Sequence, residues 1–221
     1  MLCVLQARMS SKRFPNKMLK NIKGKTLLLR VYRQLQRSKC IKKIVVATSK
    51  SKSDDSLERY CKLNKIKVFR GSKNNVSLRF YKLLKKTTYN YFVRISGDSP
   101  LIDFRLIDDM AKYSKKKNFD IITNLMPRTF PKGHSVEIIK TKFFLQFFKK
   151  IKYRFDKEHV TPFFYRKKKE FRIKSVISKK KFKKFNYCVD NKGDLEKIIK
   201  LLKICNNKVP SLNKLDKIVF N

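Results

Sequence analysis

The first seventeen residues constrain the fold most strongly. Residues 2–5 are apolar, and they lead directly into a polar, cationic stretch over residues 6–17. This change predicts a buried β-strand that ends in a loop. Backbone amides at such a strand end, together with Arg8, Arg13 and Lys17, would suit a triphosphate, because guanidinium forks and an ammonium group complement phosphate oxygens. The chain therefore begins with a predicted nucleotide site.

Short apolar runs and helical stripes alternate along the rest of the chain. Strands are predicted over residues 43–48, 66–69, 91–96, 120–123, 136–139, 171–177 and 187–189. Helices are predicted from residue 27, from residue 54, over 78–84, from residue 141, over about 156–168 and over 193–204. This alternation predicts an α/β fold with a doubly wound, mostly parallel sheet, in which ligands bind at the carboxyl ends of the strands.

The length favours one domain. At 221 residues and 42% apolar composition, residues 1–221 can bury a single large core. The pattern changes over residues 124–182, where Pro127, Pro131 and Gly133 interrupt a loop, so this segment is a candidate α+β insertion. The polar tail after residue 204 is expected to be loosely held.

The net charge is extreme. The chain has 58 Lys and Arg against 16 Asp and Glu, a formal charge of +42. Such a balance suggests nucleic acid or an anionic surface as a partner. The basic residues are nevertheless mostly lysines spread along every segment, which favours a solvated surface. We therefore expect that nucleic acid is not the partner.

Cysteine usage and hydropathy bear on the compartment. The five cysteines are widely spaced and form no C-x-x-C pair, which argues against a disulfide framework and a zinc site. The apolar run at the start is too short for a signal peptide, and no run approaches the roughly 18 residues of a membrane span. These features predict a cytoplasmic protein without a membrane span.

Two aspartates follow predicted strands directly. Asp98 comes after the strand over residues 91–96, and Asp190 comes after the strand over residues 187–189. In a parallel sheet, both carboxylates would face the crevice lined by the first loop, where they would hold Mg²⁺ against phosphates. An alternative is that each aspartate caps the helix that follows it, as strand-to-helix turns often require. The residues alone leave both possibilities open.

Six motifs, in one order, carry a resemblance to a known family. They occupy residues 6–17 (QARMSSKRFPNK), 45–49 (VVATS), 69–72 (FRGS), 94–103 (RISGDSPLID), 158–162 (EHVTP) and 189–196 (VDNKGDLE). With them the chain resembles, from about residue 2 to 205, cytidylyltransferases of the spore-coat polysaccharide biosynthesis protein F type. These are relatives of acylneuraminate and 3-deoxy-manno-octulosonate cytidylyltransferases. The resemblance implies a Rossmann-like fold of the nucleotide-diphospho-sugar transferase kind.

The resemblance also implies an activity. Such enzymes transfer CMP from CTP to an acidic sugar of the nonulosonic or 3-deoxy-ulosonic type, releasing pyrophosphate and supplying surface polysaccharide biosynthesis. It implies that Asp98 and Asp190 bind Mg²⁺ and that Arg13, Lys17 and Asp98 are catalytic. The residues it implies for nucleotide binding are Ala7, Arg8, Ser11, Arg13, Lys17 and Arg79.

The implied sugar site is less sharply defined. Arg128, Glu137, Glu158 and His159 are the candidate sugar-binding residues. An equally good interpretation of His159 is a helix residue whose polar atoms are paired with neighbouring residues. The segment over residues 124–182 would close over the sugar and contribute to a homodimer interface. Gly133-His134-Ser135 stands where the family commonly has Gly-Leu-Asp, so an expected acid is missing and the sugar class stays open.

Two other functions fit some of these features. A nucleotidyltransferase that uses another nucleotide or acceptor would bind phosphates in the same way. A basic nucleic-acid-binding protein on an inactive scaffold would show salt-sensitive duplex binding without nucleotide preference.

Overall fold

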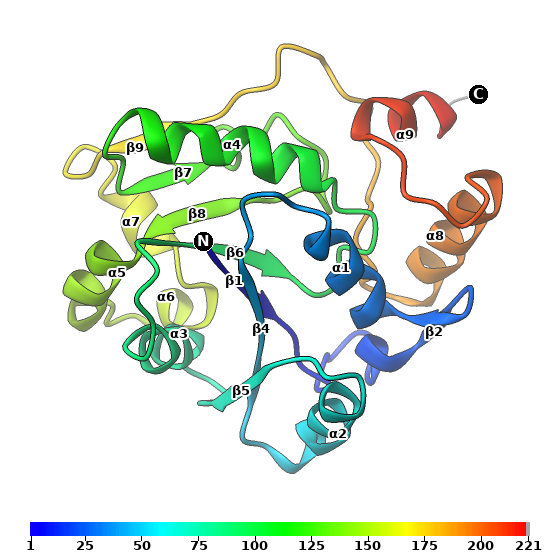
Figure 1. Ribbon diagram of the computed structural model, residues 1–221, viewed down its shortest axis with the longest axis horizontal. Helices are drawn as coiled ribbons and strands as arrows, with labels where there is room; N and C mark the ends of the chain where they lie inside the picture. The colour runs from blue at the N-terminus through cyan, green and yellow to red at the C-terminus, as the bar shows by residue number, and fades with distance from the viewer. Residues whose placement is uncertain (220–221) are drawn as a thin grey trace.

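A seven-stranded sheet forms the centre of the molecule. The computed structural model describes residues 1–219 and orders the strands β5-β4-β1-β6-β8-β7-β9 (Figure 1). Their bounds are β1 Leu2–Gln6, β4 Lys43–Ser49, β5 Val68–Gly71, β6 Tyr91–Ser96, β7 Ile121–Thr123, β8 Glu137–Lys140 and β9 Ile173–Ser175. Strand β1 runs parallel to β4 and β6, β4 to β5, and β7 to β9, whereas β8 is antiparallel to β6 and β7. The predicted mostly parallel sheet is confirmed.

Helices cover both faces of the sheet because successive strand side chains point to opposite sides. In β1, Cys3 and Leu5 join one buried cluster, and Leu2 and Val4 join the other. The first cluster includes residues of α1 Leu27–Gln36, α2 Asp55–Leu63, α4 Phe104–Lys116, α8 Lys192–Ile204 and α9 Leu212–Ile218. The second includes residues of α3 Val76–Leu84, α5 Thr141–Phe147 and α7 Pro162–Arg166. The predicted doubly wound α/β class is thus confirmed.

Several short elements complete the chain. They are η1 Lys17–Leu19, the small β2 Asn21–Ile22 and β3 Lys25–Thr26 hairpin, η2 Lys52–Asp54, η3 Phe148–Lys150 and α6 Arg154–His159. The segment over residues 124–182 supplies β8 and β9 to the main sheet, and its helices α5, α6 and α7 lie together near α3 (Figure 1). No helix within residues 1–219 is long and apolar enough to cross a membrane.

The helix predicted over about 156–168 is in fact two helices. The chain turns between α6 and α7 at Val160, whose φ is 74° and ψ is −52°. The N–H of Thr161 donates to the carbonyl of His159 at 2.9 Å across this residue, which makes a tight γ-turn. Val160 is fully buried, so the packing of its side chain offsets the energetic cost of a backbone conformation that β-branched residues avoid.

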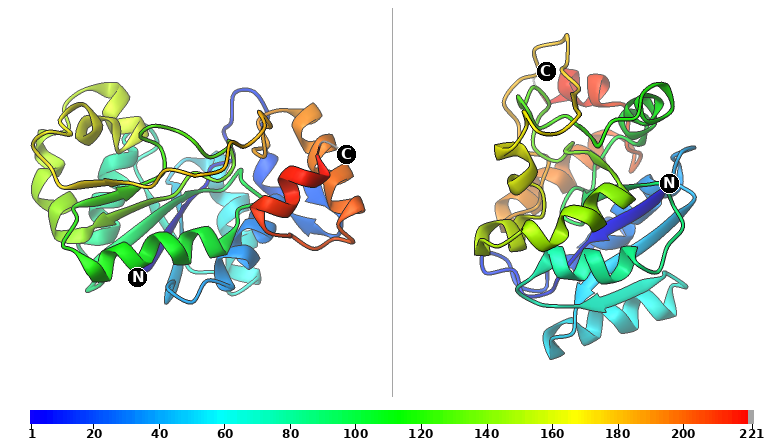
Figure 2. Two further views of the ribbon diagram at one scale, coloured as in Figure 1. Left: turned by 90° about the horizontal axis from the view of Figure 1, so that it is seen from above. Right: turned by 90° about the vertical axis from the view of Figure 1, so that its left-hand side faces the viewer.

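Two expectations for the C-terminal part are wrong. Residues 187–189 form no strand; they belong to an extended segment that leads from β9 to α8 outside the sheet (Figures 1 and 2). Its backbone is held by loops, since Tyr187 N–H donates to the Lys132 carbonyl and Val189 N–H to the Asp98 carbonyl, each at 2.9 Å. The part of the tail up to residue 219 is also not loosely held, because α9 buries Leu212 and Leu215 in the first cluster, whereas residues 220–221 lie outside the described residues.

Candidate active site

The loop after β1 is anchored by Asp54, a residue of η2. Its buried carboxylate accepts hydrogen bonds from Met9 N–H at 2.7 Å and Ser49 N–H at 3.0 Å, and also from the Ser49 hydroxyl. Burial alone would raise the pKa of Asp54, but these hydrogen bonds outweigh burial and hold that pKa below its ordinary value. Met9 in turn accepts the N–H of Asn16 at 2.9 Å, which folds the loop back on itself. This fold of the loop places Lys17 near the carboxyl ends of the central strands.

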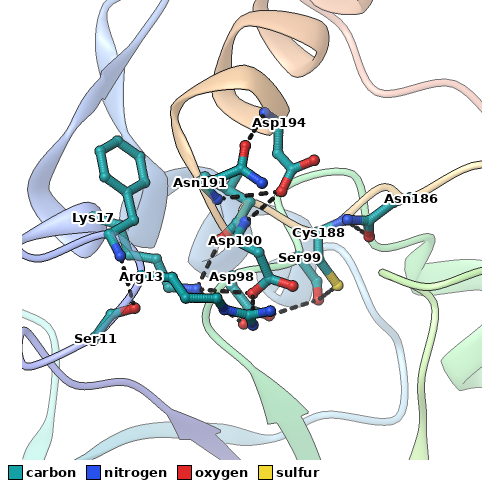
Figure 3. A network of polar contacts seen from close by, with 12 residues as sticks. Ser11, Arg13, Lys17, Asp98, Ser99, Asn186, Cys188, Asp190, Asn191 and Asp194 are labelled. Carbon is teal, nitrogen blue, oxygen red and sulfur yellow. Dashed lines mark hydrogen bonds and ion pairs between the residues drawn. The ribbon is translucent and has the colours of Figure 1, made fainter.

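Lys17 lies at the centre of the site. Its ammonium donates to the carbonyl of Val189 at 2.7 Å and to Asp98 Oδ2 at 3.3 Å, and it pairs with Asp190 Oδ1 at 3.5 Å. The Lys17 side chain is only 8% exposed. Arg13 approaches from the solvent side, with Nη2 2.8 Å from Asp190 Oδ1. Figure 3 shows the two cations and the two carboxylates directed toward one another.

The two carboxylates therefore lie close together beyond the carboxyl end of β6. Their side chains are 21% and 24% exposed for Asp98 and Asp190 respectively, so both remain open to a ligand. The alternative role as helix caps is excluded for both. Asp103 caps α4 by accepting the N–H of Arg105 at 3.1 Å, and Asn191 caps α8 in a capping box with Asp194.

Two glycines permit this approach of the loops. A Cβ on Gly97 would lie 3.1 Å from Cβ of Ala7 and 3.0 Å from Sδ of Met18, so the turn before Asp98 packs closely on the first loop. Gly133 has a φ of +96°, and a Cβ there would lie 2.6 Å from Cβ of Tyr187 and 2.8 Å from its carbonyl carbon. The loop before β8 therefore packs directly on the segment that carries Asp190.

The donor set fits a magnesium ion held together with a nucleotide. Across residues 1–219 no cluster of three or more His, Cys, Asp or Glu side chains forms a complete protein metal site. Mg²⁺, however, is usually bound by one or two carboxylates, with phosphate oxygens and waters as its other ligands. Asp98 and Asp190 already contact one ammonium group, so their oxygens lie within reach of a single cation. These two residues would hold the ion, as the resemblance implies.

The other predicted nucleotide residues have distinct surroundings. Arg8 reaches Glu158 at 3.4 Å, and both side chains are about 40% exposed. Ser11 Oγ accepts the N–H of Phe14 at 3.4 Å, and Ala7 is buried. Arg79 is 1% exposed and donates to backbone carbonyls, including that of Ser72 at 2.6 Å; burial lowers its pKa to about 10. A contact of Arg79 with the base stays a prediction.

A partly buried polar network that joins β1, β6, β8 and α7 was not predicted. Arg94, in β6, donates through Nε and Nη2 to Gln6 Oε1 at 3.2 and 3.1 Å and through Nη1 to Glu137. The Tyr165 hydroxyl donates to the other oxygen of Glu137. The pKa of Tyr165 is raised mainly by burial and, to a smaller extent, by the negative charge of Glu137. The sequence signal was an arginine inside an apolar strand. Glu137 is 2% exposed and both of its oxygens are engaged, so its contact with a sugar stays a prediction.

The remaining sugar-site candidates are more open. Arg128 is exposed and donates to Ser135 Oγ at 3.0 Å. It lines a groove of about 770 Å³ between residues 128–132 and 178–186, whose basic lining is Arg128, Lys132, Lys179, Lys180, Lys181, Lys183 and Lys184. His159 is exposed, and its ring centroid lies 4.4 Å from that of Phe155 on the same helix.

His134 occupies the position where the sequence departs from the family pattern. It is fully buried, with its ring edge-to-face on Tyr187 at a centroid distance of 5.1 Å. Burial lowers the pKa of His134 to about 4 and outweighs Asp103 and the Leu101 backbone, which act in the opposite direction. His134 is therefore a neutral core residue at neutral pH.

Comparisons with known proteins show the family of the chain. A family model described as cytidylyltransferase matches residues 2–217. The spore coat polysaccharide biosynthesis protein SpsF of Bacillus subtilis is 28% identical, over 89% of this chain and 84% of its own. A 3-deoxy-manno-octulosonate cytidylyltransferase of Syntrophotalea carbinolica is 32% identical over 48% of this chain and 41% of its own.

A solved structure extends the match to the fold. The structure of a cytidylyltransferase from Leptospira borgpetersenii superposes with a TM-score of 0.92 at 26% identity, covering 98% of this chain and 92% of the other. The family match and this superposition both include the first loop and the segment that carries Asp190. The chain therefore belongs to the cytidylyltransferase family and is a CTP-dependent nucleotidyltransferase.

Proposed function

We propose that the protein transfers CMP from CTP to a hydroxyl group of an acidic sugar, giving a CMP-sugar and pyrophosphate for surface polysaccharide synthesis. The observation that carries this proposal is the convergence of Arg13, Lys17, Asp98 and Asp190 at the carboxyl end of β6. Two cations and two partly exposed carboxylates in one cluster suit a metal-bound triphosphate. The sugar class is supported by the resemblance to the SpsF type and to 3-deoxy-manno-octulosonate cytidylyltransferases.

The reaction requires positioning and charge neutralisation. The sugar hydroxyl oxygen forms a bond to the α-phosphorus, the bond from that phosphorus to the bridging β-oxygen breaks, and pyrophosphate leaves while the hydroxyl proton passes to solvent. Lys17 and Arg13 would neutralise charge on the phosphoryl oxygens and the leaving pyrophosphate. Mg²⁺ bound by Asp98 and Asp190 would supply Lewis-acid stabilisation at the α-phosphate. Arg8, on the same loop, would bind the outer phosphates.

An anionic acceptor fits the groove beside the site. Asn186, at one end of the groove, lies four residues before Asp190, so the two residues are at most roughly 13 Å apart along the chain. Arg128 lines this groove, and no carboxylate within residues 1–219 lies within ion-pair distance of it. A sugar carboxylate would give this guanidinium a bidentate partner. The acidic class of the acceptor is thus proposed from Arg128 and from the basic lining.

The first test measures pyrophosphate release from CTP with a panel of nonulosonic and 3-deoxy-ulosonic acids. The wild-type protein should release pyrophosphate with at least one acid when Mg²⁺ is present, and Asp98→Asn should lower kcat/KM by about a hundredfold or more. Asp109→Asn, on the exposed surface of α4, is the matched control and should leave the rate unchanged. Wild-type rates retained by Asp98→Asn would remove the proposed metal role.

The second test examines the acceptor class through Arg128→Ala. Loss of a charge-assisted contact should raise KM for the acidic sugar by about tenfold or more, with KM for CTP unchanged. A neutral sugar used as readily as the acid by the wild-type protein would contradict the acidic class. Homodimer formation also stays a prediction, which light scattering in solution would test directly.

A further inference from the structure

Lys17 is the shared partner of the two carboxylates. Its ammonium donates hydrogen bonds to the Val189 carbonyl at 2.7 Å and to Asp98 Oδ2 at 3.3 Å, and its nitrogen forms an ion pair with Asp190 Oδ1 at 3.5 Å. A metal ion bound by the same two carboxylates would take the place that this ammonium now holds beside them.

The three contacts differ in length, which indicates which of them is given up. The bond to the Val189 carbonyl is 2.7 Å, a strong charge-assisted hydrogen bond, whereas the contacts to Asp98 and Asp190 are 3.3 and 3.5 Å. Only the two carboxylates can accept another cation in exchange. Lys17 can thus retain its bond to the backbone while its contacts with the carboxylates are replaced.

The charges of the cluster balance. Asp98 and Asp190 contribute two negative charges, and Lys17 and Arg13, which contacts Asp190 at 2.8 Å, contribute two positive charges. A divalent cation on the same two carboxylates would supply the same positive charge. Lys17 and Arg13 would then be left beside the phosphates with their charges uncompensated by protein.

We propose that Lys17 and Arg13 are the counter-ions of the Asp98–Asp190 pair in the nucleotide-free protein, and that CTP and the divalent cation bind through an exchange of these ion pairs. The two cations move from the carboxylates to the triphosphate as the metal takes the carboxylates. This inference rests on the metal site of the proposed function. It adds that the ion pairs of Lys17 and Arg13 with the carboxylates break when the metal and the nucleotide bind. The free protein should bind divalent cations weakly, and nucleotide and metal should strengthen each other's binding.

The test measures Mn²⁺ binding by the full chain without nucleotide, from the electron paramagnetic resonance signal of free Mn²⁺. Lys17→Met keeps the length of the side chain and removes its charge, so it should increase Mn²⁺ affinity about tenfold or more over the wild type, because one close charge shifts the binding of a proton to a carboxylate by about tenfold or more. Adding Asp98→Asn to Lys17→Met should abolish that gain. Lys12→Met, an exposed lysine of the same loop, should leave Mn²⁺ binding unchanged.

Three results are distinguishable. Tighter binding by Lys17→Met that depends on Asp98 supports the exchange. Equal Mn²⁺ affinity in Lys17→Met and wild type, with CTP still promoting Mn²⁺ binding, overturns the exchange and leaves the metal site intact. No Mn²⁺ binding by wild type even with CTP overturns both. If Lys17→Met lacks a cooperative thermal transition, Lys17→Gln and Arg13→Gln provide the same measurement, and Arg13→Gln should show a smaller gain because Arg13 is 70% exposed and contacts only Asp190.

Discussion

Aspartates around the first loop differ in what surrounds their carboxylates. Asp54 is fully buried and accepts from two backbone N–H groups and a hydroxyl, so its charge holds backbone in place. Asp98 and Asp190 are partly exposed and face cations, so their charges can accept a ligand. One residue type thus serves as an anchor in one place and as a binding group in another.

The anchoring role predicts a cost for Asp54→Asn. An amide nitrogen would face backbone donors and leave at least one of them unpaired in a buried site, which should lower the free energy of unfolding by about 1–3 kcal/mol. Urea denaturation at pH 7 would measure this change. Asp109→Asn, whose carboxylate is exposed and pairs only with Lys112, should shift the free energy of unfolding by less than about 1 kcal/mol.

The effect of Asp54 should depend on pH. Because the folded pKa of Asp54 lies below its ordinary value, its stabilisation is fully present above an unfolded pKa of about 3.9 and is lost as pH falls through the folded pKa. The difference in unfolding free energy between the wild type and Asp54→Asn should therefore shrink between pH 5 and pH 2, two values chosen to bracket that range. A difference that stays constant with pH would contradict this account of the anchor.

Among the elements, the loop before β8 positions the segment that carries Asp190. Gly133→Ala would impose a left-handed conformation on an alanine and drive its Cβ into Tyr187, so it should lower the free energy of unfolding by roughly 2–5 kcal/mol. It should also raise the metal concentration needed for activity, because Tyr187 lies three residues before Asp190.

Gly24→Ala isolates the backbone contribution to that effect. Gly24 has a φ of +81°, but a Cβ there meets no atom within 4 Å. Its substitution should cost only the roughly 1–2 kcal/mol of the left-handed conformation and leave the metal requirement unchanged. Equal losses of stability in Gly133→Ala and Gly24→Ala, measured by thermal unfolding, would show that Tyr187 moves aside to accommodate the added methyl group.

Elements with a strong local signal were predictable from the sequence. The strands β4 and β6 and the helix α8 lie close to their predicted positions because apolar runs and helical stripes report burial directly. The segment over residues 187–189 has the same apolar signal as a strand, yet its partners are loops far away in the chain. Helix α9 was missed because only a few of its residues, Leu212 and Leu215 among them, are buried in a lysine-rich tail.

The site was predictable to a similar extent. The positions of Lys17 and Asp98 followed from strand ends, because the carboxyl edge of a parallel sheet gathers residues that are distant in sequence. Asp190 lies beside them although no strand precedes it, because hydrogen bonds to loops hold residues 187–189 there. The ion pairs among them, the anchor at Asp54 and the network around Arg94 did not follow, since they depend on which side chains meet after the loops have packed.

For the whole molecule, the net charge of +42 should oppose the compact state through self-repulsion. Raising NaCl from about 10 to 100 mM shortens the screening length from about 30 to 10 Å, so Tm should rise by several degrees. An equal osmolarity of a neutral solute controls for effects unrelated to charge. A Tm that falls over this range of salt would show that ion pairs such as that of Asp156 and Arg166 outweigh the repulsion.

The charge also bears on the nucleic-acid alternative. A binding surface for a duplex should give an affinity that falls steeply with salt and shows no preference for a nucleotide. A thermal shift produced by CTP, and not by ATP, GTP or UTP at equal concentration, would assign the basic surface a general electrostatic role and the nucleotide site a specific one.

Asp98 and Asp190 are proposed to bind one divalent cation together with the nucleotide. The most direct test of this proposal is the anomalous scattering of manganese in crystals of the protein grown with CTP and Mn²⁺. We expect a manganese peak about 2.0–2.2 Å from a carboxylate oxygen of each residue and next to a phosphate oxygen. A manganese peak bound by phosphates alone, with Lys17 still between the two carboxylates, would contradict it.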